Sequence, residues 1–220
     1  MEGLNAYVDA YCERMEPGLF GEPLNALTNL SFIIAAVFAW SMLGKQKLPL
    51  ARALVAILFL IGVGSTLFHT FATRWAALTD VIPIAAFILV YIYVANREYL
   101  ELSLVASLAG VVLFFVYAPL ASFAINYLFD AIGSSSGYAA VALLIFIYAA
   151  ALRKNQPRIS RGLLIGGTIL AVSIGFRTID DYACARLPFG THFMWHILNG
   201  IMLAWMIEVY RRSALEKSRA

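Results

Sequence analysis

Long apolar stretches separated by short polar connections dominate the sequence. Seven of them are long enough to cross the roughly 30 Å of hydrocarbon in a bilayer as helices. They cover residues 24–44, 50–70, 77–96, 100–120, 134–153, 161–179 and 190–210. Lipid offers the backbone no water as a hydrogen-bond partner, so segments of this length are expected to be helical. The pattern predicts an all-α membrane protein, with residues 1–220 forming a single seven-helix bundle.

Composition supports this class. Hydrophobic residues make up 62% of the chain and charged residues 13%, which is more apolar than a soluble core of 220 residues could bury. Residues 1–23 are polar and acidic and lack both an apolar signal core and a small-residue cleavage site. We therefore expect an extramembrane N-terminal segment and no removable signal peptide.

Basic residues are distributed unequally between the two ends of the predicted bundle. Threading seven spans places most of them on one side: Lys45, Lys47, Arg52, Arg97, Arg153, Lys154, Arg158, Arg161, Arg211, Arg212, Lys217 and Arg219. Arg14, Arg74, Arg177 and Arg186 remain on the other side. The positive-inside rule then predicts a cytoplasmic C-terminus and an N-terminus that is outside or lumenal. The basic residues are too dispersed to indicate a nucleic-acid partner.

All three histidines lie at similar depth near the outer ends of two predicted spans. His192 and His196 are one helical turn apart and share a face, and Ser65 lies one turn from His69 in the same way. Asp80 follows at the outer start of the third span. Three imidazoles that leave a fourth position open are typical of a catalytic zinc site. We therefore predict that the histidines bind zinc.

Each of these residues also has a simpler interpretation. A single histidine in a membrane helix can be an interhelical hydrogen-bonding group, Ser65 can bond back to the carbonyl of residue 61, and Asp80 can cap a helix. Haem is the competing metal centre, but histidines one turn apart cannot take opposite faces of one porphyrin. Retinal would need a lysine in the seventh span, where there is none.

Two cysteines, Cys12 and Cys184, both fall on the predicted non-cytoplasmic side. A disulfide is permitted in such an oxidising compartment, and the alternative is a pair of free thiols too far apart to bridge. Because the chain has no other cysteine, we favour the disulfide. The charged residues of the nearby loop are expected to pair with one another, and they are Arg177, Asp180, Asp181 and Arg186.

Several short motifs together resemble those of the alkaline ceramidases. They are Tyr11-Cys12-Glu13, Gly21-Glu22-Pro23-Leu24-Asn25, Gly64-Ser65 with His69 four residues after the serine and Asp80 eleven residues further on, Asp180 followed by Cys184, and His192 followed by Trp195-His196. The resemblance covers nearly the whole chain. This family belongs to a superfamily of seven-helix intramembrane hydrolases that also includes the adiponectin and progestin receptors.

The resemblance implies a function and a set of roles. Zinc would be held by the three histidines, Ser65 and Asp80 would be catalytic, and Cys12 would be bridged to Cys184. The activity would be hydrolysis of the N-acyl bond of ceramide or a related lipid, giving a fatty acid and a sphingoid-type base. The membrane would be a bacterial inner membrane or that of the endoplasmic reticulum or Golgi.

The resemblance also implies calcium bound by the N-terminal segment. Glu13 and Glu22 match the family pattern, whereas Met15 stands where an amide ligand is expected and Asp9 is displaced by one residue. Calcium would then require substitutes, for which Asp9, Glu16 and Asn25 are the candidates. The alternative is that these acidic residues are simply solvated.

Two other functions compete with the hydrolase. A receptor or lipid sensor would keep zinc as a structural brace, but the short tails leave little room for a signalling domain. A transporter or channel would carry polar residues through the whole bilayer depth, whereas here they are concentrated at one end.

Overall fold

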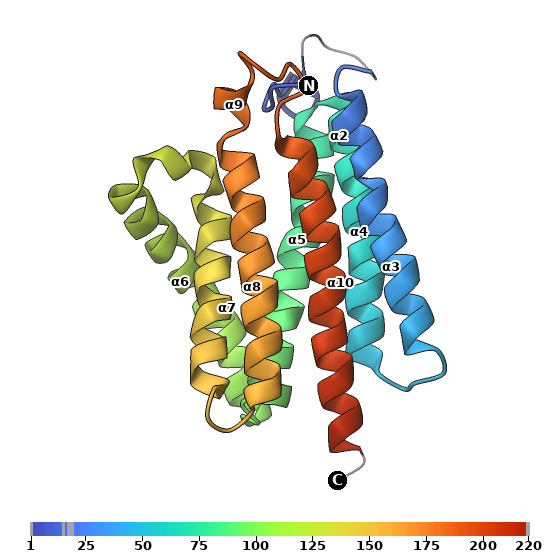
Figure 1. Ribbon diagram of the computed structural model, residues 1–220, viewed down its shortest axis with the longest axis vertical. Coiled ribbons are helices and arrows are strands. Elements are labelled where there is room, and N and C mark those ends of the chain that lie inside the picture. The colour runs from blue at the N-terminus through green and yellow to red at the C-terminus, as the bar shows by residue number, and fades with distance from the viewer. Residues whose placement is uncertain (1, 15, 17–19, 219–220) are drawn as a thin grey trace.

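The computed structural model describes residues 2–14, 16 and 20–218, and these form a bundle of seven long helices (Figure 1). The long helices are α2 (Pro23–Thr28) continued by α3 (Leu30–Leu43), α4 (Pro49–Phe71), α5 (Arg74–Val94), α6 (Leu104–Leu128), α7 (Ser136–Leu152), α8 (Pro157–Thr178) and α10 (His192–Lys217). The short elements are α1 (Glu2–Asn5), the π-helical turn η1 (Ala95–Tyr99), the 3-10 turn η2 (Asp130–Ser135) and α9 (Asp180–Ala183). Each of the seven is long and apolar enough to cross a membrane. The predicted all-α fold is confirmed.

Two helix boundaries differ from the expected spans in informative ways. The fourth span begins at residue 104 instead of 100, because the Ser103 hydroxyl accepts a hydrogen bond from the Ala106 N–H and caps α6 there. The third span begins at Arg74, and Thr73 occupies its N-cap position. Asp80 therefore lies inside α5, and the interpretation of Asp80 as a helix cap is wrong.

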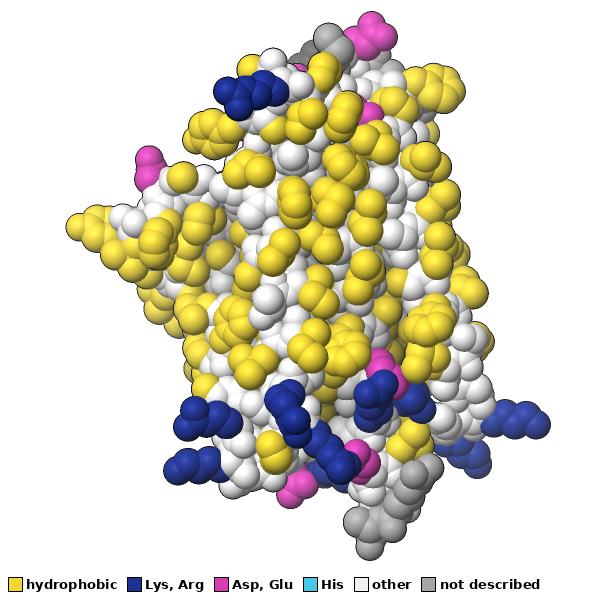
Figure 2. All heavy atoms as spheres, in the orientation of Figure 1, with side chains coloured by type: hydrophobic (Ala, Val, Ile, Leu, Met, Phe, Trp, Pro, Cys, Tyr) yellow, Lys and Arg dark blue, Asp and Glu magenta, His cyan; other side chains and the backbone are white. Residues whose placement is uncertain are grey.

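The outer surface of the bundle is an apolar belt (Figure 2). The Lys and Arg side chains visible in this view gather mainly near the end of the molecule where the chain terminates. Burial differs between the helices. In an apolar stretch of 18 residues, 50% of α10 is buried inside the protein, against 6% of α6. Helix α10 is thus central, whereas α6 is peripheral and leans away from the other helices in Figure 1.

Helices α4 and α5 make a very close backbone approach at Gly64. A Cβ atom added to Gly64 would lie 1.9 Å from the Thr79 carbonyl oxygen, so this approach requires glycine. The next residue in each helix is a candidate site residue, Ser65 in α4 and Asp80 in α5. Gly64 therefore brings these two side chains together.

Replacing Gly64 with alanine is expected to lower the thermal unfolding midpoint of the purified protein in detergent. The new methyl group meets backbone, which cannot move aside as a flexible side chain can, and overpacking of this kind costs about 1–3 kcal/mol. Gly137→Ala is the matched control, because no atom lies within 4 Å of its added Cβ. Equal midpoints for the two variants would contradict the close approach.

Candidate metal centre

Three histidines from two helices converge near one end of the bundle. His69 lies in the last turn of α4, and His192 and His196 lie in the first two turns of α10. All three are buried, at about 1% exposure each. One ring nitrogen from each lies within 4.8 Å of those of the other two. The predicted juxtaposition is therefore present, and this group of atoms could hold a metal ion.

The hydrogen bonds behind the rings determine which nitrogens face the centre. The Nδ1 atom of His69 lies 2.6 Å from the Glu22 carboxylate. Burial alone would raise the pKa of Glu22, but hydrogen bonds from His69, Asn25 and Arg14 hold that pKa below its usual value. The ionised carboxylate can only accept, so His69 carries its hydrogen on Nδ1 and directs the Nε2 lone pair inward.

His196 is oriented in the same manner by Thr28. The Thr28 hydroxyl donates to the Leu24 carbonyl at 2.9 Å and so accepts from His196 Nδ1, also at 2.9 Å. The two inward Nε2 atoms of His69 and His196 are then lone pairs 3.1 Å apart. Two facing lone pairs repel unless a cation lies between them. Two nitrogens of a tetrahedral zinc site are about 3.3 Å apart, from zinc–nitrogen bonds of about 2.0–2.1 Å, so the spacing fits a metal.

The third ring, His192, is held by stacking. Tyr11 of the N-terminal segment stacks on it at a centroid distance of 3.5 Å and an interplanar angle of 14°. Its Nδ1 atom is buried and has no hydrogen-bond partner among the described residues. A buried imidazole nitrogen left without a partner costs free energy, and a metal ion bound at this nitrogen would give it one.

Ser65 and Asp80 flank the histidines. Ser65 is buried and hydrogen-bonds to the half-buried Asp80 carboxylate, and the His69 imidazole and the Arg177 guanidinium also lie near this carboxylate. The next residue, Thr66, is the one whose hydroxyl bonds back to its own helix, because it donates to the Gly62 carbonyl at 2.7 Å. A carboxylate and a hydroxyl thus lie beside the imidazole cluster.

The N-terminal segment closes this end of the bundle. Its backbone pairs with the turn between α4 and α5, where the Val8 N–H donates to the Ala72 carbonyl at 2.8 Å. A disulfide joins Cys12 to Cys184, with their Cα atoms 5.5 Å apart, so the predicted bridge is confirmed. The segment is thereby anchored on both sides of the histidine cluster.

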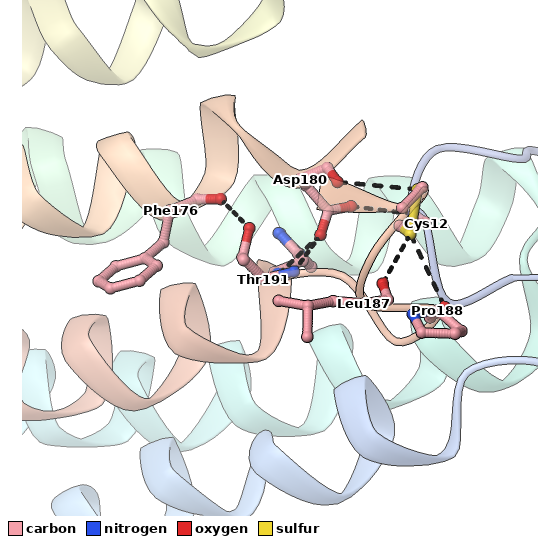
Figure 3. Close-up of a disulfide and its surroundings, with 8 residues drawn as sticks. Cys12, Phe176, Asp180, Leu187, Pro188 and Thr191 are labelled. Carbon is pink, nitrogen blue, oxygen red and sulfur yellow. Dashed lines mark hydrogen bonds between the residues drawn. A yellow bond between two sulfur atoms is a disulfide. The ribbon is translucent and has the colours of Figure 1, made fainter. Parts of the chain in front are cut away.

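Asp180 organises the loop that carries the disulfide (Figure 3). Its carboxylate accepts from three backbone N–H groups, those of Cys12 at 2.9 Å, Thr191 at 2.6 Å and His192 at 2.8 Å. The last two belong to the start of α10, whose first N–H groups have no partner within the helix. Asp180 therefore fixes the entry of His192 into its helix.

The expected pairing of Arg177, Asp180, Asp181 and Arg186 with one another is wrong. Arg177 instead donates to Ser135 at 2.8 Å and Ser134 at 3.1 Å. It also lies against the ring of Tyr11 at 5.7 Å. Asp180 is buried and accepts from backbone N–H groups, which need partners when they are buried, whereas Asp181 and Arg186 are exposed to solvent.

Two apolar cavities lie inside the bundle. One is bordered by Phe32, Tyr138, Trp195 and Asn199, close to the site, and a second extends toward Tyr148 and Met206 at the other end. Both are also lined by Phe87, Ile88, Val141, Leu170, Met202 and Leu203. Phe32 and Trp195, which border the first cavity, also contact the rings of His196 and His192, so this cavity lies close to the polar cluster.

Two of the residues proposed for calcium, Glu13 and Glu22, bond to other groups of the protein. Glu13 accepts from the Leu24 and Asn25 N–H groups at 2.7 and 2.8 Å, and Glu22 bonds to His69 as described. Asp9 and Glu16 are exposed, and Met15 lies outside the described residues. Calcium stays a prediction.

A comparison with models of known protein families shows to which family the chain belongs. A model described as ceramidase matches residues 11–219, nearly the full length. The chain belongs to the ceramidase family. No curated protein matches it. Members of the ceramidase family are hydrolases of the amidase type that act on the N-acyl amide bond of ceramide, so the substrate is a lipid and the receptor interpretation is not supported.

Some residues of this ceramidase site carried no signal in the sequence. Thr28 supports His196 across 168 positions, and Tyr11, near the start of the chain, stacks on His192 near its end. Spacing rules relate residues on one helix, and they do not pair residues from segments this distant. Tyr11 and Glu22 stood in the family-like motifs, but their contacts with the histidines became visible only in the structure.

Proposed function

We propose that this ceramidase is a zinc-dependent intramembrane amidohydrolase. It cleaves the N-acyl bond of ceramide or a related N-acyl lipid and releases a fatty acid and a sphingoid-type base. The observation that carries the proposal is the pair of inward imidazole lone pairs of His69 and His196, 3.1 Å apart. With His192 they form a three-nitrogen site that leaves a coordination position open.

Each neighbouring side chain has a role in amide hydrolysis. When bound, zinc activates water as a nucleophile by lowering its pKa to about 7. Asp80 accepts the proton of the attacking water and delivers it to the leaving amine nitrogen. Ser65, which hydrogen-bonds to Asp80, would turn to donate to the amide carbonyl oxygen of the substrate as negative charge develops there.

The apolar cavities explain why this chemistry is placed within a membrane. They begin beside Trp195 and Asn199 and are lined by aliphatic and aromatic side chains, which suit an acyl chain. Burying each methylene contributes about 0.8 kcal/mol, so chain binding can hold the amide at the polar end.

We place the site on the non-cytoplasmic side of the membrane. Basic residues cluster at the opposite end of the bundle, in the connections after α3, α5 and α7 and in the C-terminal turns of α10. The positive-inside rule assigns that end to the cytoplasm. The membrane is a bacterial inner membrane or that of the endoplasmic reticulum or Golgi.

Ser65→Ala is expected to lower kcat for fatty-acid release by about 10²–10³-fold, the usual effect of removing one oxyanion donor. Zinc content should not change, because Ser65 is not a ligand in this proposal. Thr66→Ala is the control, since its hydroxyl bonds only to its own helix. Wild-type kcat in Ser65→Ala would contradict the assigned role.

Fatty-acid release by the purified protein tests the function itself. Ceramides and other N-acyl lipids of varied chain length are incubated with the zinc-loaded protein, and both products are quantified by mass spectrometry. The proposal predicts equal amounts of fatty acid and amine from at least one substrate. Absence of turnover on every N-acyl lipid would contradict it.

A further inference from the structure

A guanidinium group is buried directly behind the metal centre. The Arg14 side chain has 0% exposure, and its Nε atom lies 2.5 Å from Glu22 Oε1. Its Nη2 atom donates to the His69 carbonyl oxygen at 2.8 Å. A buried charge is tolerated only when it is paired and hydrogen-bonded, and here Glu22 and the end of α4 supply these contacts.

Glu22 connects this cation to the candidate metal ligand. One carboxylate oxygen accepts a hydrogen bond from Arg14, and the other accepts from His69 Nδ1 at 2.6 Å and from Asn25 Nδ2 at 2.9 Å. The carboxylate therefore cannot rotate without breaking several bonds. A carboxylate behind a ligating imidazole fixes both its tautomer and its direction.

The N-terminal segment is shaped around the guanidinium. A Cβ atom at Gly21 would lie 2.7 Å from both Arg14 Nη1 and the Glu16 carbonyl oxygen, and because the second is backbone, glycine is needed for the chain to pass this close to the guanidinium. Arg14 also lies 5.9 Å from the centre of the Tyr7 ring. Packing on both sides holds the cation beside Glu22.

The same contacts disfavour calcium in this segment. Calcium takes six to eight oxygen ligands. Among the described residues, the carboxylate oxygens of Glu13 and Glu22 are occupied by N–H donors, and Asn25 Oδ1 is buried without a partner. Asp9 and Glu16 are exposed, so Asn25 Oδ1 is the one buried oxygen of this candidate set that is free for a cation, and the guanidinium would repel a divalent ion.

We propose that Arg14 is a positioning residue that acts as a built-in cation of the N-terminal segment. It fixes the Glu22 carboxylate so that Glu22 directs the His69 imidazole toward the metal, and it makes the segment independent of calcium. The inference rests on the proposed zinc site. It does not depend on which lipid is hydrolysed.

Zinc affinity of the full-length protein in detergent tests this inference. Titration against a competing chelator should show about 10–100-fold weaker zinc binding for Arg14→Gln and for Glu22→Gln, the usual loss when the hydrogen-bonding support behind a metal ligand is removed. The double variant should be no weaker than Glu22→Gln, because Arg14 acts through Glu22. Arg14→Lys should recover part of the affinity by restoring the charge. Arg186→Gln, in an exposed loop position, should match wild type.

Several outcomes would overturn the inference. Wild-type zinc affinity in Arg14→Gln, or additive losses in the double variant, would show that Arg14 does not act through Glu22. If Arg14→Gln does not fold, Arg14→Lys and Glu22→Gln supply the same comparison. Stoichiometric calcium in wild-type protein dialysed against millimolar calcium chloride would also contradict it. Failure of the proposed function is distinguishable, because a protein that binds zinc through this network but hydrolyses no N-acyl lipid contradicts only the function.

Discussion

Asp80→Asn is expected to lower kcat for fatty-acid release by about 10²–10⁴-fold, the range that general acid–base catalysis contributes. Asparagine has the shape of aspartate and can still bond to Ser65, but it cannot accept the proton of the attacking water. Because Asp80 lies beside the histidines without belonging to their three-nitrogen group, bound zinc should be unchanged. Kinetics with saturating substrate and elemental analysis of the same preparation measure both quantities.

Asp181→Asn is the matched control for this experiment. Asp181 is an exposed carboxylate in the short helix α9, next to Asp180. The control should keep wild-type turnover. An Asp80→Asn protein that releases fatty acid at the wild-type rate would remove Asp80 from the mechanism.

His196→Ala is expected to abolish both stoichiometric zinc binding and fatty-acid release. The substitution removes one of the two facing lone pairs and leaves only His69 and His192 to hold an ion. Zinc content by elemental analysis and product formation by mass spectrometry should fall together.

Thr28→Val provides a graded comparison. It keeps all three imidazoles and removes only the hydroxyl that accepts from His196 Nδ1. Its zinc affinity should weaken by about 10–100-fold. Equal affinity of His196→Ala and wild type would show that this histidine is not a ligand.

The hydropathy pattern predicted those features of the site that depend on the depth of a residue in the bilayer. Span length and loop charge placed His69, His192 and His196 at a common level, and the structure brings the three together. Cys12 and Cys184 were likewise placed on one side of the membrane and are joined. Depth follows from counting residues along helices of known rise.

The arrangement around the bundle axis could not be predicted in this way. Hydropathy does not say which helices are neighbours, so the support of His196 by Thr28 was invisible. Asp180 was expected in an ion pair, but it accepts from three backbone N–H groups because the chain folds back on itself there. The sequence placed Arg14 among the charges of the outer side and did not indicate that it is buried. Its burial depends on pairing with Glu22, eight positions away.

Elemental analysis of the purified wild-type protein measures whether three imidazoles bind one divalent metal ion. We expect one zinc ion per chain, lost on replacement of His196 and retained on replacement of Asp80. An active protein without a stoichiometric divalent metal, or a His196→Ala protein with the full complement of zinc, would contradict this expectation.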